Sequence, residues 1–215
     1  MHERTERATG WLTLAGMARF LEGGVPEERG QSVSRGDLFA TDARTGIVIG
    51  AEAWTAEESL IYAADYLALK PGISLYAEVT GPRAALEKAF PSGRTEILAL
   101  GGQGRHVRVT RQARPSWPAY PSVTHGRRLL VLTTPGLFAA GWRPGGLNPV
   151  AAAVPGHVAF SGWDLARNGP KPTRFAAIAG SVLFFDTPPV VAGASLCDEA
   201  EDGQVGWGCY LEGIW

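Results

Sequence analysis

The sequence predicts an α+β fold built on antiparallel sheets, with helix in the minority. Its 28 glycines and 15 prolines in 215 residues favour turns and short strands over a helical bundle. Apolar residues make up 45% of the chain, which is enough for a hydrophobic core. Two short apolar runs bounded by Gly and Pro, His157 to Phe160 and Ser181 to Phe185, indicate strands covered on at least one face. We expect one compact unit over 1–215, or two interlocked lobes with a boundary near 111–128.

The N-terminal part of the chain predicts one amphipathic helix over residues 11–22. Apolar residues recur at spacings of three and four from Trp11 to Leu21, which places them on one helical face. The Gly-Gly pair that follows is expected to end the helix. Residues 23–36 are polar and glycine-rich, so we expect a mobile loop there.

The next part of the chain predicts strands and includes one ambiguous segment. Ile47 to Ala53 alternates as a strand, and Arg44-Thr45-Gly46 before it places an arginine beside a glycine at the mouth of the strand, where the guanidinium can reach a phosphate. Residues 55–69 suit a helix with a capping box formed by Thr55 and Glu58, but extended structure is an open alternative.

A strand, a helix and a strand then follow in the order that a ferredoxin-like unit requires. We expect a strand over Ile73 to Val79, a short helix with proline in its first turn over Pro82 to Phe90, and a strand over Ile97 to Leu100. Farther on, Leu129 to Leu132 predicts a strand and Thr134 to Ala140 a short helix.

A glycine-rich loop, Leu100-Gly101-Gly102-Gln103-Gly104-Arg105, lies directly after the last strand of that unit. Glycines allow backbone N–H groups to point together at an anion, and Arg105 adds positive charge. The spacing fits neither a P-loop nor a dinucleotide fingerprint. A tight hairpin is the competing interpretation.

Residues 111–128 combine prolines, arginines and aromatic side chains without an acid. The aromatic faces of Trp117 and Tyr120 can stack on bases, while guanidinium groups pair with phosphates. We therefore expect a flexible loop that contacts RNA and includes His125. The competing interpretation is a linker between two lobes.

A second basic loop, Gly169-Pro170-Lys171-Pro172-Thr173-Arg174, joins the two apolar runs. The prolines fix their own φ angles and favour extended conformations in the residues before them. Lys171 and Arg174 are therefore expected to project from a stiff, non-helical segment, which suits a polyanionic ligand.

The net charge of −1 and the pI near 6.4 hide an uneven distribution of charge. From Ile97 to Phe185 the chain carries ten basic residues and a single acid, Asp164, whereas the remainder carries ten basic and twenty acidic residues. Such a chain can present one positive face to a phosphate backbone. A solvated arginine face or an interface with an acidic protein would give the same pattern.

The sequence gives no support for a cofactor, a metal or a membrane. Cys197 and Cys209 form neither a metal-ligand spacing nor a disulfide framework, and no signal peptide or membrane span precedes them, so we expect a cytoplasmic protein. His106, His125 and His157 are available to a nuclease, but none lies in a motif that pairs it with another catalytic group. No catalytic residue is therefore predicted, and a β-rich enzyme for a small molecule has only the glycine loops in its favour.

Several motifs occur in an order that carries a family resemblance. They are GWDL at 162–165, PKPTR at 170–174 and AGSVLFF at 179–185, preceded by Arg44-Thr45-Gly46-Ile47, TAEESLIYAADYLALKPGISLYAEV at 55–79 and LALGGQGR at 98–105, and followed by Gly203 to Trp215. Over about residues 36 to 215 the chain resembles the subunit that caps the 5′ end of the guide RNA in type III-B CRISPR (Cmr) effector complexes, within the RAMP superfamily.

The resemblance implies a RAMP architecture of ferredoxin-like (RRM-like) units with glycine-rich loops, and extended structure over residues 55–69. The opening strand and helix of the first unit have no counterpart, so that unit is expected to be incomplete. The resemblance also implies a non-catalytic subunit that holds the 5′ handle of the crRNA and docks on the large polymerase-like subunit and on the backbone RAMP subunit, in antiviral defence. The alternative within the superfamily is a crRNA-processing endoribonuclease.

The expected RNA contacts are cationic or aromatic side chains beside glycines that let the backbone approach sugar and phosphate. In the C-terminal glycine-rich loop, Trp207 stands where the family commonly has a smaller aromatic residue. The predicted RNA-binding residues are Arg44, Gly101, Gly102, Arg105, His125, Arg127, Arg128, Lys171, Arg174, Gly203, Gly206, Trp207 and Gly208.

Overall fold

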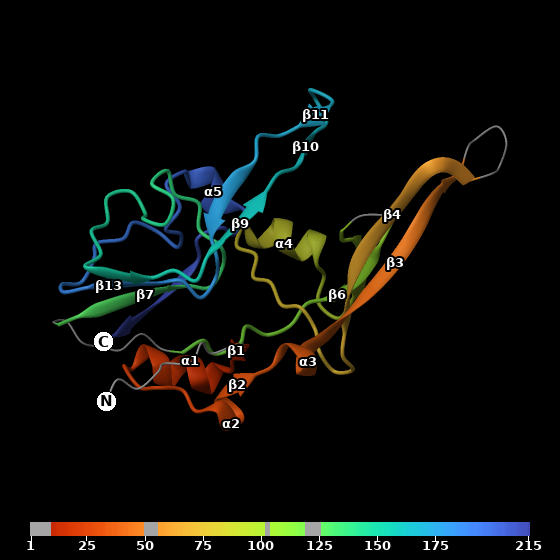
Figure 1. The fold of residues 1–215 in the computed structure, drawn as a ribbon. Helices are drawn as coiled ribbons and strands as arrows, with labels where there is room; N and C mark the ends of the chain where they lie inside the picture. The colour runs from red at the N-terminus through yellow and green to blue at the C-terminus, as the bar shows by residue number, and fades with distance from the viewer. Residues whose placement is uncertain (1–9, 50–55, 102–103, 119–125) are drawn as a thin grey trace. The chain divides into compact units, whose positions relative to one another are not determined.

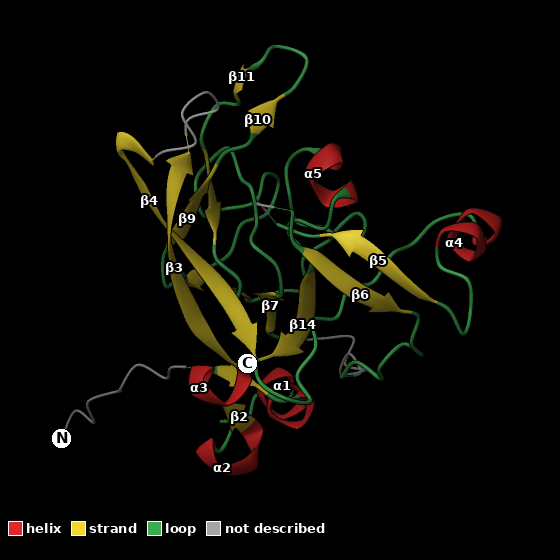
Figure 2. Ribbon diagram, turned by 90° about the vertical axis from the view of Figure 1, so that its right-hand side faces the viewer, coloured by secondary structure: helices red, strands yellow, loops and turns green. Residues whose placement is uncertain are grey.

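The computed structural model describes residues 10–49, 56–101, 104–118 and 126–215. The described helices are short, and the strands form small antiparallel sheets (Figure 2), so the predicted α+β class with helix in the minority is confirmed. The His125 and Gly102 positions lie outside the described residues.

The chain divides into two units. The first consists of residues 1–33 and 118–215, and the second consists of residues 34–117, which are inserted into the sequence of the first.

A four-stranded antiparallel sheet forms the centre of the first unit (Figure 1), with its strands in the order β14-β7-β13-β8. The strands predicted at 129–132 and 181–185 are confirmed as two of them. The bounds are β7 (Arg128–Leu132), β8 (Ala151–Ala153), β13 (Val182–Phe185) and β14 (Tyr210–Ile214).

Every residue of β7 is buried, because side chains pack on both faces of the sheet. A strand covered on both faces has a continuous apolar sequence, and Leu129 to Leu132 fits that pattern. The buried cluster on one face is Leu130, Leu132, Phe138, Ala177, Leu183, Phe185 and Leu196, and that on the other is Leu21, Leu129, Val131 and Val182.

The predicted N-terminal helix exists but begins later than expected, as α1 (Leu14–Leu21). Trp11 and Leu12 form a short strand, β1 (Trp11–Leu12), and Thr13 caps the helix because its hydroxyl accepts a hydrogen bond from the Gly16 N–H at 3.2 Å. A side-chain cap of this kind satisfies an N–H group that has no partner within the helix.

The glycine pair ends α1 as predicted, with Gly23 at φ +81°. The mobile loop predicted over 23–36 is wrong, because this segment contains α2 (Glu28–Gln31), β2 (Ser32–Val33) and the start of α3 (Arg35–Leu38). β2 returns to pair with β1, and this pairing supplies the polar segment with backbone partners that its composition does not reveal.

An extended hairpin arm projects from the sheet between β8 and β13 (Figure 1). We use the name hairpin arm for residues 157–177. It contains two successive antiparallel ladders, β9 paired with β12 and then β10 paired with β11. The bounds are β9 (His157–Phe160), β10 (Trp163–Asp164), β11 (Gly169–Pro170) and β12 (Arg174–Ala177).

The hairpin arm confirms the strand predicted at His157 to Phe160 and the non-helical loop around Lys171. The strand β9 is mostly exposed, however, so the expectation that it is covered does not hold. His157 is exposed, and its ring lies edge-to-face with the Phe175 ring, with 5.5 Å between the ring centres.

The short helix predicted over Thr134 to Ala140 is wrong. Gly136 exchanges two backbone hydrogen bonds with Ala177, each 2.9 Å long, and Leu137 and Phe138 are buried. This tertiary bridge holds the segment in an extended path, which overrides the local signal from its proline. A short helix, α5 (Ala200–Gln204), lies in the connection between β13 and β14.

The second unit contains a long two-stranded ribbon and a shorter hairpin. β3 (Phe39–Ile49) pairs with β4 (Ala56–Leu69), so the strand implied by the family resemblance over 55–69 is confirmed and the helix alternative is wrong. Residues 44–46 lie within β3 and not at the mouth of a strand, because β3 begins earlier than the expected start at Ile47.

The predicted helix and strand after this ribbon are confirmed as α4 (Arg83–Ala89) and β5 (Thr95–Ala99), and β5 pairs with β6 (His106–Thr110). The strand predicted over 73–79 is wrong, since that segment has no ladder within the described residues. Alternating polarity alone does not make a strand without a neighbouring edge.

Candidate nucleic-acid interface

Arg174 and Trp207 lie in one cluster of the first unit, although they are far apart in the sequence. The Arg174 guanidinium donates two hydrogen bonds to the buried Asp202 carboxylate, of 2.7 and 2.6 Å. Its central carbon lies 5.9 Å from the centre of the Phe160 ring, and Phe160 is its cross-strand partner between β9 and β12. The Phe160 ring in turn stacks on Trp207, with ring centres 4.4 Å apart and planes inclined by 25°. We call these four residues the Arg-aromatic stack.

The Arg174 guanidinium is therefore bound to a carboxylate of the protein itself, whereas the sequence predicted that it projects from a stiff loop towards a ligand. The hydrogen bonds that Arg174 donates to Asp202 raise the pKa of the Arg174 guanidinium above its ordinary value, so the group stays charged. Because 45% of its side chain stays exposed, it still adds positive charge to the surface of the stack.

The closing glycine loop is held on the same cluster by its own backbone. The Trp207 N–H donates to the carbonyl of Asp202 at 3.1 Å, and the Gly206 N–H donates to the carbonyl of Gly203 at 3.1 Å. The Trp207 carbonyl accepts a hydrogen bond of 2.7 Å from the Ser195 hydroxyl. These bonds fix the position of the half-buried tryptophan ring against Phe160.

The three predicted glycines of this loop have different reasons to be glycine. A Cβ on Gly208 (φ +70°) would lie 2.7 Å from the Cys197 sulfur, and one on Gly203 would lie 2.8 Å from the Ser195 Cβ. Packing therefore requires glycine at both positions. Gly206 (φ +89°) has no neighbouring atom within 4 Å of such a Cβ, so its side is open to a ligand.

Lys171 is exposed on the hairpin arm, and its backbone is tied down on both sides. Its N–H donates to the Gly162 carbonyl at 2.7 Å, and its carbonyl accepts from the Ser161 hydroxyl at 2.7 Å. Among the residues that the structure describes, no carboxylate lies within 4 Å of its ammonium group. A fixed backbone with an uncommitted ammonium group suits contact with a phosphate.

Arg127 and Arg128 are neighbours with opposite environments. Arg128 is 1% exposed within β7, so the prediction that it contacts RNA at the surface is wrong for this structure. Arg127 is exposed, lies 4.6 Å from the centre of the Trp215 ring, and pairs with Asp186 at 3.4 Å. Only Arg127 stays available to a ligand.

In the second unit, Arg44 and Arg105 gather on one tyrosine ring. The guanidinium carbons of Arg105 and Arg44 lie 3.8 and 5.5 Å from the centre of the Tyr66 ring. Asp42, opposite Tyr66 in the ribbon, accepts two hydrogen bonds from Arg44, and these lower the pKa of the Asp42 carboxyl. The ribbon thus brings together two predicted RNA contacts that the sequence separates.

Gly46, the glycine beside Arg44, has a packing role that the sequence did not suggest. A Cβ there would overlap the ring of its cross-strand partner Tyr62. The aromatic ring covers the glycine, as occurs in sheets where an aromatic residue compensates for the missing side chain.

β5 and β6 form a hairpin, and the glycine-rich segment lies at its turn. This agrees with the tight hairpin that the sequence analysis gave as the competing interpretation. The Leu100 N–H donates to the carbonyl of Arg105 at 3.0 Å, and both Gly101 and Gly104 have positive φ angles. Arg105 at the end of the turn reaches Tyr66 on β4.

Glu78 organises a cluster that sequence reasoning missed. It accepts hydrogen bonds from the Trp117 indole at 2.6 Å, from Arg114 at 3.1 Å and from the Tyr76 hydroxyl at 3.1 Å. The bond from Trp117 contributes most to lowering the pKa of the Glu78 carboxyl. The start of the predicted flexible loop is therefore fastened by side chains, and no local signal links Glu78 to residues so far along the chain.

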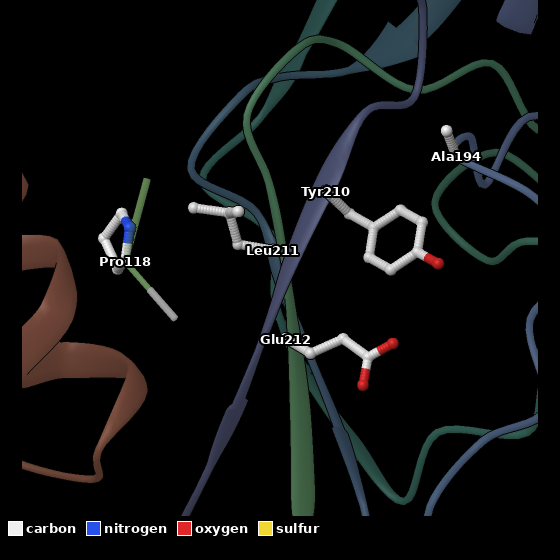
Figure 3. Close-up of a pocket in the computed structure, with 5 residues that line it drawn as sticks. All are labelled: Pro118, Ala194, Tyr210, Leu211 and Glu212. Carbon is white, nitrogen blue, oxygen red and sulfur yellow. The ribbon is translucent and has the colours of Figure 1, made fainter. Parts of the chain in front are cut away.

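An open groove of 410 Å³ runs along β14 in the first unit (Figure 3). Tyr210 and Glu212 extend to one side of the strand, whereas Leu211 extends toward Pro118 on the other. Burial, and then the nearby Glu212, raise the pKa of the Tyr210 hydroxyl. Among the described residues, the lining of the groove includes no basic side chain and no predicted RNA contact.

The described residues contain no helix that is long and apolar enough to cross a membrane. Within the same residues, no group of three or more His, Cys, Asp or Glu side chains is arranged to hold a metal ion. The cytoplasmic location expected from the sequence stays a prediction.

Seven chains of solved structures match this one, and two of them are as follows. One is a chain of the type III-B Cmr-beta complex bound to cognate target RNA, with 18% identity and a TM-score of 0.52 over 81% of this chain and 57% of that chain. The other comes from the same kind of complex with target RNA and AMPPnP, state 1, with 19% identity and a TM-score of 0.45 over 68% of this chain and 46% of that one. The first of these two matches shows a shared fold, and the matched region covers 57% of the length of the Cmr-beta chain.

The sequence comparisons give the family. No curated protein sequence matches this one. The sequence model of the family described as CRISPR-associated protein (Cas_Cmr3) matches residues 1–215, which is the whole chain. The chain therefore belongs to the Cas_Cmr3 family of CRISPR-associated proteins.

Proposed function

We propose that this protein is a non-catalytic RNA-binding subunit of a type III-B CRISPR effector complex, and that it holds the 5′ handle of the crRNA. Its family membership and its likeness to a chain of a Cmr-beta complex support the assembly. The large polymerase-like subunit and the backbone RAMP subunit are its proposed protein partners.

The observation that carries the proposal is the Arg-aromatic stack beside the open side of Gly206. A ring that is already stacked and anchored through its backbone offers a rigid surface to an unpaired base. Lys171 supplies an uncommitted cation, and Gly206 lets the ligand backbone come close. Together they provide stacking, charge and close approach, which are the three needs of a single-stranded RNA site.

The sheet of the first unit supports a ferredoxin-like interpretation. Its third strand in sequence, β13, lies between the first, β7, and the second, β8, and the fourth, β14, lies outside the first. This strand order is the one expected of a split β-α-β unit, and it supports the proposal that the sheet is ferredoxin-like, with a loop in place of the first crossover helix. We propose that the two units are two lobes of the RAMP architecture.

The test is to express the chain with its partner subunits and the CRISPR RNA, isolate the complex and sequence the bound RNA from its 5′ ends. We expect a uniform repeat-derived tag at the 5′ end. Lys171→Ala together with Trp207→Leu should reduce the share of tagged RNA, whereas Arg83→Ala, an exposed arginine paired with Glu87 in α4, should leave it unchanged. Random 5′ ends with the unaltered protein would refute the proposed handle role.

A separate cleavage assay tests the proposed lack of catalysis. The isolated chain should leave a repeat RNA intact with and without divalent metal ions. Cleavage that disappears in His106→Ala or His157→Ala would replace the proposal with a processing endoribonuclease.

A further inference from the structure

A groove in the second unit combines guanidinium, hydroxyl and amide groups, and its lining includes no carboxylate among the residues that the structure describes. It has a volume of 540 Å³ and is open to solvent. The turn before β5 and the segment after β6 form its two walls, and Arg111 donates a hydrogen bond of 3.3 Å to the Ser92 hydroxyl across it. The lining residues are Ser92, Gly93, Arg111, Gln112, Ala113 and Arg114.

Positive charge continues from the groove along β6. The strand alternates between exposed and half-buried residues, so His106, Arg108 and Thr110 share the exposed face, and Arg111 follows directly. Of the two groove arginines, Arg114 pairs with Glu78, whereas Arg111 has no carboxylate within 4 Å among the described residues. Arg108 likewise has no carboxylate within 4 Å among the described residues, so Arg108 on the strand and Arg111 at its end form a positive strip that favours an extended polyanion.

The chemistry of the groove favours nucleic acid over an acidic protein. Protein interfaces need an apolar or aromatic centre, whereas protein contacts with nucleic acids are polar and strongly positive. Within the described part of the chain, the one apolar side chain of the lining is the methyl group of Ala113. Ser92 and Gln112 add the neutral hydrogen-bonding groups that commonly contact phosphate and sugar oxygens.

A neighbouring aromatic ring favours a single strand over a duplex. Trp117 follows Arg114 by three positions, its indole N–H is fixed on Glu78, and 40% of the residue is exposed. A fixed and exposed indole can stack on an unpaired base, which a duplex does not offer.

We propose that this groove binds the sugar–phosphate backbone of single-stranded RNA without sequence preference, as a contact separate from the Arg-aromatic stack. The inference rests on the proposed RNA-binding function and adds to it the backbone as ligand and Arg111 as the main contact. Arg111 and Arg114 belong to the segment 111–128 that the sequence predicted to contact RNA, and the structure adds the opposite wall of the groove at Ser92 and Gly93.

The experiment uses the full chain and two single-stranded RNAs of equal length, one with the repeat-derived 5′ tag and one without it. Affinity is measured by fluorescence anisotropy over a series of salt concentrations. For Arg111→Ala we expect a several-fold loss of affinity for both RNAs by the same factor, and a log–log salt slope lower by about 0.7 for one lost phosphate contact. The control Arg83→Ala should change neither quantity.

The outcomes separate this inference from the proposed function. Arg111→Ala with unchanged affinity and slope, at an unchanged melting temperature, would overturn the groove as an RNA site. The same result combined with lost binding to a polyglutamate peptide would assign the groove to an acidic protein instead. A wild-type chain that binds both RNAs equally would refute handle recognition and leave the groove proposal standing, provided that Arg111→Ala weakens both.

Discussion

The two units of this chain differ in how their strands are covered. In the first unit, side chains pack on both faces of the sheet, and β7 is buried along its whole length. In the second unit, none of the described residues whose exposure is defined is buried, although the unit has strands of 11 and 14 residues. Apolar side chains such as Ile47 and Ile61, which face each other across the ribbon, are 52% and 71% exposed.

The difference shows that strand length and stability have separate origins. Isolated two-stranded ribbons are marginal in water, because they bury little apolar surface. The first unit therefore contributes most of the folding free energy of the chain, and the second contributes surfaces. Substitutions should follow the same division, with large effects on stability in the first unit and small ones in the ribbon.

The largest effect is expected for Leu130→Ala, in the centre of β7. Leu130 is 0% exposed and belongs to the larger buried cluster, so its truncation leaves a cavity. Such changes cost about 2–5 kcal/mol of unfolding free energy, and urea denaturation monitored by circular dichroism measures the loss. A cost below about 1 kcal/mol would contradict the assignment of the stabilising core to this sheet.

An intermediate effect is expected for Gly206→Ala, in the closing loop. The added methyl group meets no atom within 4 Å, but the φ angle of +89° strains any residue with a side chain, at about 1 kcal/mol. If the open side of Gly206 faces RNA, the affinity for tagged guide RNA falls further than this small loss of stability explains. Unchanged affinity with a lowered melting temperature would restrict the glycine to a role in the turn.

The smallest effect is expected for Ile61→Thr, on the ribbon. Threonine keeps the strand preference, and the isoleucine is largely exposed, so the free energy of unfolding should change by less than about 0.5 kcal/mol. Thermal unfolding followed alongside Leu130→Ala makes the comparison direct. A marked loss of stability would mean that the ribbon is covered in solution and would remove the contrast between the units.

The sequence predicted a strand correctly where a continuous apolar run itself indicated burial, as at residues 129–132. It failed where the outcome depended on a distant partner. Residues 73–79 alternate but have no neighbouring ladder, and the proline signal at 134–140 lost to the backbone bridge between Gly136 and Ala177.

The same limit applies to the candidate site. The sequence alone does not distinguish Arg127 from Arg128. Arg128 is buried because it is the first residue of β7, whereas Arg127 lies just before the strand and is exposed. Family motifs pointed to both Arg174 and Trp207, but their common stack depends on a cross-strand pairing with Phe160 that no motif contains. Glu78 had no signal at all, because its partners lie in a separate stretch of the chain.

The hairpin arm has a consequence for motion that follows from its register. The pairing is interrupted twice along the arm. The first break lies between the pairs Ala153–Val182 and His157–Ala177, and the second lies between the pairs Phe160–Arg174 and Trp163–Pro170. At each break the returning strand has one residue more than the outgoing strand. The regular ladder stops at these breaks, where the bonds from the Lys171 N–H to Gly162 and from the Ile178 N–H to Gly156 bridge the two strands. Local opening proceeds in cooperative segments of this kind. Amide hydrogen exchange should therefore fall in steps from tip to base, with β10 and β11 fastest, β9 and β12 slower because Asp202 braces Arg174, and β13 slowest.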